Sequence, residues 1–104
     1  MELLFALLAA INIEFSWDHQ NDAKGYKVGT STTTGGPYAY VDVGAGTAVP
    51  GTPARVSYLW SNWDSSTKKF VVVKAYNDVL DSDPSGEIPV GKPIAPKNLS
   101  AAQK

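Results

Sequence analysis

The sequence predicts an all-β domain of two packed sheets, and three observations lead to this prediction. From Ile11 to Trp17, apolar residues alternate with polar ones, which is the pattern of a strand with one buried face. The stretch from Phe70 to Tyr76 is the most β-prone in the chain, because it is rich in valine and aromatic residues. Turns that contain glycine or proline separate such stretches at the short spacing of an all-β domain.

Turn-forming residues set the bounds of each expected element. A polar loop over residues 18–24 follows the first strand, and Gly35-Gly36-Pro37 forms a strong turn. Residues 44–53 form a loose stretch, and residues 61–69 are expected to be a polar connection. The expected strands span residues 11–17, 25–34, 38–43, 55–60, 70–76 and 87–90. Their inward faces predict a core of Ile13, Phe15, Trp17, Tyr26, Val71, Val73 and Ala75.

Length and composition exclude several classes of function. A chain of 104 residues is long enough for one domain with a real core, but not for two. Charged residues make up 18% of the chain, the net charge is −1 and no basic cluster stands out. Nucleic acid is therefore not an expected partner. The absence of cysteine excludes disulfides and thiolate metal sites.

The first ten residues form an apolar segment ahead of the sandwich. The segment carries Glu2 where a secretory signal has Lys or Arg, and it leads directly into the first strand. It is too short to span a bilayer, which takes about 20 apolar residues. A packing segment and a signal remnant are both open interpretations. As a packing segment, it would offer a partner Leu3, Leu4, Phe5, Leu7 and Leu8. We expect the sandwich over residues 11–91 and a proline-containing tail over residues 92–104.

Four separate segments occur in an order that is typical of one family. They are Ser16-Trp17-Asp18, Gly25-Tyr26-Lys27-Val28, residues 71–77 and Ser82-Asp83-Pro84-Ser85. Together they resemble a fibronectin type III domain, an immunoglobulin-like sandwich, in the version common in bacterial secreted proteins and phage structural proteins. The resemblance covers residues 11–90. It implies that Trp17 lies in the core, that Tyr26 lies on the next strand and that Ala75 faces inward.

Two positions depart from the pattern of that family. Lys69 stands where the family usually has a tyrosine, and the usual first strand is missing before Ile11. The tail from Pro93 to Ala101 has the composition of such a strand, at the other end of the chain. We therefore hypothesise donor-strand exchange, in which Ile94 to Leu99 completes a neighbouring copy. The alternatives are that residues 1–10 supply the edge strand, or that the tail is a plain linker.

No catalytic or metal-binding constellation stands out in the sequence. His19 is the only histidine and lies in a polar loop, and no nucleophile-elbow pattern is present. Aspartates gather in two loops, at residues 18–22 and 78–83, where they could bind Ca²⁺. Neither loop has the spacing of a known calcium site, and acidic residues commonly form turns. We expect no cofactor, no metal and no enzymatic activity.

Aromatic residues exceed what the expected core needs. The surplus consists of Tyr38, Tyr40, Tyr58, Trp60 and Trp63. These rings could seal the ends of the sandwich, form a protein interface or stack against sugars. Phe70 and Val72 add apolar surface, because they lie on the second face of a strand whose first face is already apolar. The N-terminal segment or a neighbouring subunit would cover that second face.

These observations favour a non-enzymatic structural module of a larger assembly. The expected setting is a phage virion, with the chain as a decoration, fibre or tail-associated protein. Its location would be the virion surface or extracellular space, and its partners would be copies of itself or other structural proteins. The alternative is a secreted adhesion or carbohydrate-binding module that binds surface glycans. A sandwich fold by itself does not decide between them.

Overall fold

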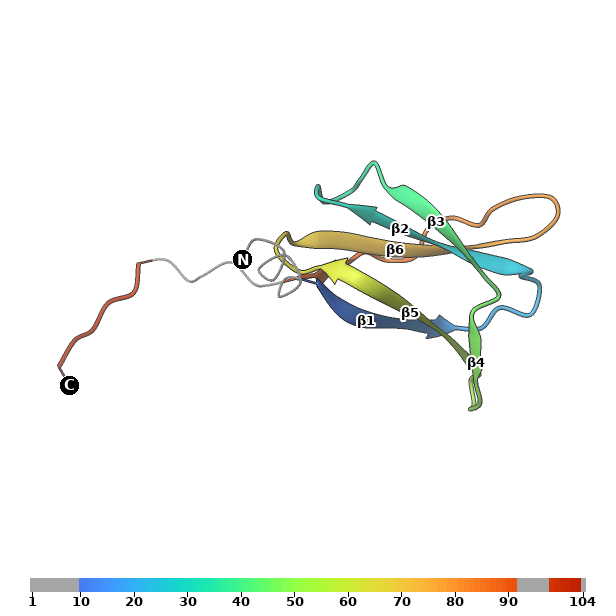
Figure 1. The fold of residues 1–104 in the computed structure, drawn as a ribbon, viewed down its shortest axis with the longest axis horizontal. Coiled ribbons are helices and arrows are strands. Elements are labelled where there is room, and N and C mark those ends of the chain that lie inside the picture. Colours follow the sequence, from blue (N-terminus) through green and yellow to red (C-terminus); the bar gives the residue numbers. More distant parts are fainter. Residues whose placement is uncertain (1–9, 92–97, 104) are drawn as a thin grey trace.

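Two antiparallel sheets pack face to face in the computed structural model, which describes residues 10–91 and 98–103 (Figure 1). The first sheet has the order β1-β5-β4 and the second has the order β3-β2-β6-β7. The strands of the first sheet are β1 (Ala10–Asp18), β4 (Thr47–Val49) and β5 (Arg55–Asp64). Those of the second are β2 (Gly25–Ser31), β3 (Ala39–Gly44), β6 (Lys69–Tyr76) and β7 (Ile88–Val90). The predicted all-β, two-sheet fold class is confirmed.

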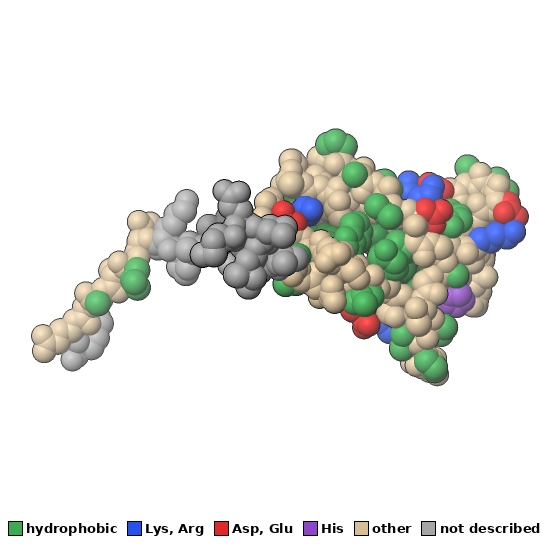
Figure 2. All heavy atoms as spheres, viewed as in Figure 1, with side chains coloured by type: hydrophobic (Ala, Val, Ile, Leu, Met, Phe, Trp, Pro, Cys, Tyr) green, Lys and Arg blue, Asp and Glu red, His purple; other side chains and the backbone are tan. Residues whose placement is uncertain are grey.

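Surface charges are mixed, as the low net charge leads us to expect. On the face shown in Figure 2, hydrophobic side chains gather between the two sheets, while basic and acidic side chains lie beside one another in small groups. Lys24 pairs with Asp78, and Arg55 pairs with Asp18, both at 2.6 Å. These pairs lie on the surface and therefore contribute little to stability.

A bulge in β5 overturns the expected polar connection over residues 61–69. The strand continues to Asp64, but its register against β1 shifts between Ile11 and Ile13. Ile11 lies opposite Trp63, whereas Ile13 lies opposite Trp60, so β5 carries one extra residue. Asn62 takes a left-handed conformation at this point, with φ of 60°. The bulge turns both tryptophans toward the same face of the sheet.

Trp63 is therefore a core residue, which rules it out as part of an exposed interface. Its side chain is 2% exposed, and its ring packs edge-on against Phe15 at 5.5 Å and Trp60 at 5.2 Å. Trp60 is partly buried against the same cluster. Lys69, which replaces the tyrosine usual in the resembled family, places its ammonium group 5.1 Å from the centre of the Trp63 ring.

Three of the seven expected core residues are buried, and the other four are only partly buried. Phe15, Tyr26 and Val71 are buried, and Val28, Val56 and Trp63 join them without having been expected. The other expected core residues are only partly buried: Ile13, Trp17, Val73 and Ala75. Ile11 is exposed at the end of the sandwich.

Val72 is buried on the outer face of the second sheet, which corrects its assignment as an interface residue. Gly29 lies opposite both Val72 and Tyr40, so the three residues form one row across β6, β2 and β3. A Cβ atom at Gly29 would lie 2.7 Å from the Tyr40 ring and 3.0 Å from Tyr38. The missing side chain at Gly29 lets the Tyr40 ring lie over the glycine, in the same row as Val72, which is 3% exposed. Val72 is therefore covered within the chain, whereas Phe70 on the same face is only partly buried.

Replacing Trp63 by alanine tests the corrected core. Trp63→Ala should lower the free energy of unfolding by about 3–5 kcal/mol, because it removes a wholly buried ring and leaves a cavity. Leu59→Ala is the matched control on the same strand, since Leu59 is 54% exposed; its cost should stay below about 1 kcal/mol. Urea unfolding followed by circular dichroism measures both. Equal losses for the two variants would contradict the bulge.

Candidate functional site

An open strand edge is the first component of the candidate site. Within the described residues, β1 pairs only with β5, and β7 pairs only with β6. Each sheet therefore ends in a strand with one free side. A free side presents a row of backbone N–H and C=O groups that can pair with a further strand.

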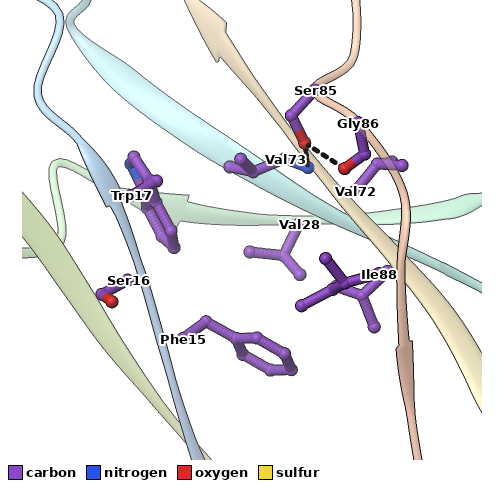
Figure 3. A pocket seen from close by; sticks show the side chains of 10 residues that line it. Phe15, Ser16, Trp17, Val28, Val72, Val73, Ser85, Gly86 and Ile88 are labelled. Carbon is purple, nitrogen blue, oxygen red and sulfur yellow. Dashed lines mark hydrogen bonds between the residues drawn. The ribbon is translucent and has the colours of Figure 1, made fainter.

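An apolar groove of about 220 Å³ lies between these two edges (Figure 3). Phe15 and Trp17 extend from β1 on one side, and the segment from Ser85 to Ile88 forms the other side. Side chains of Val28 and Val73, from the central strands of the second sheet, lie between them. Trp17 is only partly buried because it faces this groove. Its indole N–H has no hydrogen-bond acceptor among the described residues.

The groove continues into a wider and more polar part of about 420 Å³. The two parts share Trp17, Val73 and Ser85. Three aspartates, Asp18, Asp22 and Asp83, line the polar part together with Lys74, which pairs with Asp81. Asp18 is paired with Arg55, whereas the carboxylates of the other two have no ionic partner in the described part of the chain. The groove therefore has one apolar part and one acidic end.

Two serines attach the far wall of the groove to β6. The Ser85 hydroxyl accepts a hydrogen bond from the Val73 N–H at 2.9 Å, and the Ser85 N–H donates to the Val73 carbonyl at 2.8 Å. Ser82 repeats this pattern with Ala75, at 2.9 and 2.7 Å. The two serine hydroxyls thus accept backbone hydrogen bonds that the carbonyl groups of a neighbouring strand would otherwise accept. The segment is bonded to β6 without continuing β7 as a regular strand.

Glu87 anchors the same wall to the turn between β2 and β3. Its carboxylate accepts hydrogen bonds from the Thr34 hydroxyl at 2.6 Å, the Gly35 N–H at 2.8 Å and the Tyr38 hydroxyl. The bonds from Thr34, Tyr38 and Gly35 hold the pKa of Glu87 below its ordinary value. The same carboxylate raises the pKa of Tyr38. The position of the wall therefore depends on an ionised Glu87.

The residues expected to form an interface have different surroundings. Tyr38 and Tyr40 are partly buried and pack edge to face, with ring centres 6.3 Å apart. Phe70 is partly buried opposite Pro89 of β7. Leu99 is 97% exposed. Ile94 and the five apolar residues of the N-terminal segment lie outside the described residues. Most residues that line the groove were expected in the core or in the segments that resemble the family, whereas Gly86 and Ile88 were not singled out.

The loop residues weighed for chemistry make structural contacts. Tyr26 accepts a hydrogen bond from the Gln20 N–H at 2.9 Å, and its hydroxyl lies 3.3 Å from Nδ1 of His19. Asp81 bonds to Lys74 and Lys27, and these ammonium groups lower its pKa. Over residues 10–91 and 98–103, no group of three or more His, Cys, Asp or Glu side chains is placed to hold a metal ion. No helix suited to crossing a membrane occurs in those ranges.

The strand order and the core define a fibronectin type III-like sandwich, and a comparison with solved structures supports this assignment. The chain is similar to a Fn3-like protein from Clostridium thermocellum, with a TM-score of 0.61 and 22% sequence identity. The match covers 81% of this chain and 79% of that one. No protein-family model and no curated protein matches the sequence. The resemblance found in four sequence segments is thus confirmed at the level of the fold.

Acid should weaken the groove wall through Glu87. Its pKa is lowered in the folded state, so its contribution is complete above the ordinary value of 4.5 and is lost as the pH falls through the folded-state pKa. Glu87→Gln should lower stability at pH 7, and its deficit should shrink as the pH falls below about 4.5. The control is Glu14→Gln, at an exposed position of β1. Thermal unfolding at pH 7 and pH 3 measures the deficit, and a deficit independent of pH would contradict the anchor.

Proposed function

We propose that the chain is a non-catalytic structural module that joins a larger assembly through an added strand at the open edge of β1. The observation that carries this proposal is the apolar groove between the free sides of β1 and β7. The fibronectin type III-like fold is compatible with a role in assembly.

The edge and the groove supply different parts of the binding energy. Backbone groups along β1 would pair with the added strand, and alternate side chains of that strand would enter the groove and set its register. Burying one leucine-sized side chain contributes about 1.5–3 kcal/mol. Phe15, Trp17 and Ile88 line the space that such a side chain would occupy.

The proposed setting is a phage virion, where the module would serve as a decoration, fibre or tail-associated protein. The sequence resemblance to the fibronectin type III version found in phage structural proteins supports this setting. The alternative is a secreted adhesion or carbohydrate-binding module. Tyr40 favours it, because its ring lies over Gly29 on the outer face of the second sheet, where a sugar could reach it. Lys74 already lies 4.1 Å from the centre of the Tyr40 ring, which argues against stacking there.

A side chain added at Gly86 tests the role of the groove. Gly86 lines the groove, and a Cβ atom there would meet nothing within 4 Å, so a larger residue is compatible with the fold. Gly86→Leu should prevent incorporation into the assembly, whereas the matched Gly86→Ala should retain it. Incorporation is measured by quantifying the chain in purified particles. Normal incorporation of the leucine variant would disprove the proposal.

The virion setting has its own test. The native chain should be present in purified virions in many copies, as measured by quantitative mass spectrometry and antibody labelling. It should show no binding on a glycan array. A chain recovered only from the culture medium, with a defined glycan ligand, would favour the adhesion module instead.

A further inference from the structure

We propose that the strand added to the groove is residues 94–99 of a second copy of this chain. The proposal rests on the function proposed above and names the partner at the same site. Its basis is the direction, reach and chemistry of the tail compared with those of the groove.

The direction of the strands fixes where the tail leaves the sandwich. Ala10 lies opposite Asp64, and Lys69 lies opposite Val90, so β1 begins and β7 ends at the same pole. β5 ends at Asp64 and β6 begins at Lys69, so the short turn between them places both of these residues at that pole. A strand antiparallel to β1 must instead begin at the other pole, where β1 ends at Asp18. The tail therefore departs from the wrong pole to pair antiparallel with its own β1.

The reach of the tail excludes this pairing within one copy. The nine residues of β1 are about 30 Å long. The eight residues from Lys92 to Leu99 span at most about 28 Å when fully extended. Residues 94–99 would be used up in reaching the far pole, and only residues 100–104 would be left to run back along β1. In a second copy stacked head to tail, the same residues meet that pole first and run antiparallel, the more stable pairing.

The chemistry of the tail matches the two parts of the groove in order. Residues 92–104 contain three lysines and no acidic residue. A tail that begins at the acidic end brings Lys97 to the side of Asp22 and Asp83, and Leu99 farther in, beside the apolar part. Leu99 is 97% exposed within its own copy and so is free to bind another. The acidic part of the groove would thus match the charge of the tail, and the apolar part would match its apolar side chain.

The pole that receives the tail also presents apolar side chains. Val79 and Leu80 form the tip of the loop after β6 and are 79% and 73% exposed. The loop is the orange segment at the right of Figure 1. Asn77 holds the tip in place, because its side-chain oxygen accepts the N–H groups of both residues at 2.8 and 3.0 Å. Head-to-tail stacking would set this tip against Ile11, which is exposed at the opposite pole.

Two variants of the full chain test the proposal, one in the tail and one in the groove. Leu99→Asp disables the tail, and Gly86→Leu fills the groove. The wild-type chain should form species larger than the 11.1 kDa monomer, with a mass that rises with concentration in light scattering. Each variant alone should stay monomeric. Their mixture should form a complex of two chains and stop there, because only one working tail and one working groove remain.

The controls separate the contact from charge and folding effects. Ser100→Asp adds the same charge to the adjacent residue, whose side chain points to the opposite face of a strand, and it should assemble like the wild type. Gly86→Ala should do the same. Circular dichroism and thermal unfolding of all four variants should match the wild type, because every substitution lies at an exposed position.

The outcomes distinguish this proposal from the one on which it rests. Assembly of Leu99→Asp but not of Gly86→Leu would show that the groove is used by another strand, so the tail proposal alone would fail. Normal assembly of Gly86→Leu would overturn both. A wild-type chain that is monomeric at every concentration, or a mixture that forms no complex, would overturn the tail proposal.

Discussion

The edge-to-face packing of Phe15 against Trp60 and Trp63 is the contact on which the rest of the sandwich depends. Phe15 is the only buried side chain of β1, and in the described part of the chain that strand is hydrogen-bonded on one side alone. The aromatic cluster therefore does much of what a second neighbouring strand would do. Both tryptophans reach Phe15 because the bulge at Asn62 places them on one face. The open edge of β1 can exist because this packing holds the strand from within.

The sequence predicted the position of a strand well where one face is buried and the other is exposed to solvent. That alternation places β1 within one residue of its observed bounds, whereas β2 and β6, which bury adjacent residues, were located by their flanking turns and β-prone composition. It failed over β4, whose three residues are all exposed and carry no alternation. It failed again in the second half of β5, because a bulge breaks the period of two on which the prediction relies. The burial of Val72 was missed because its cover depends on a glycine in the neighbouring strand.

The candidate site was predictable only in part. The free side that β1 has among the described residues was anticipated, because the sequence before Ile11 departs from the pattern of the resembled family. The groove wall left none, since Glu87 is 52 positions from Gly35, and their contact arises only when the sheets assemble. Ser82 and Ser85 belong to a segment that resembles the family, but the sequence does not show that they attach the groove wall to β6 through hydrogen bonds. Tertiary contacts between distant segments do not leave a local pattern.

The groove has unlike ends, and this asymmetry has a consequence for growth. Its acidic end faces the pole where β1 finishes, and its apolar part lies farther along the strand. Every copy added through this groove would therefore point the same way, and a row of copies would have two different termini. One terminus would carry an unfilled groove and the other a free tail. Length control would then need two different capping molecules, or closure of the row into a ring.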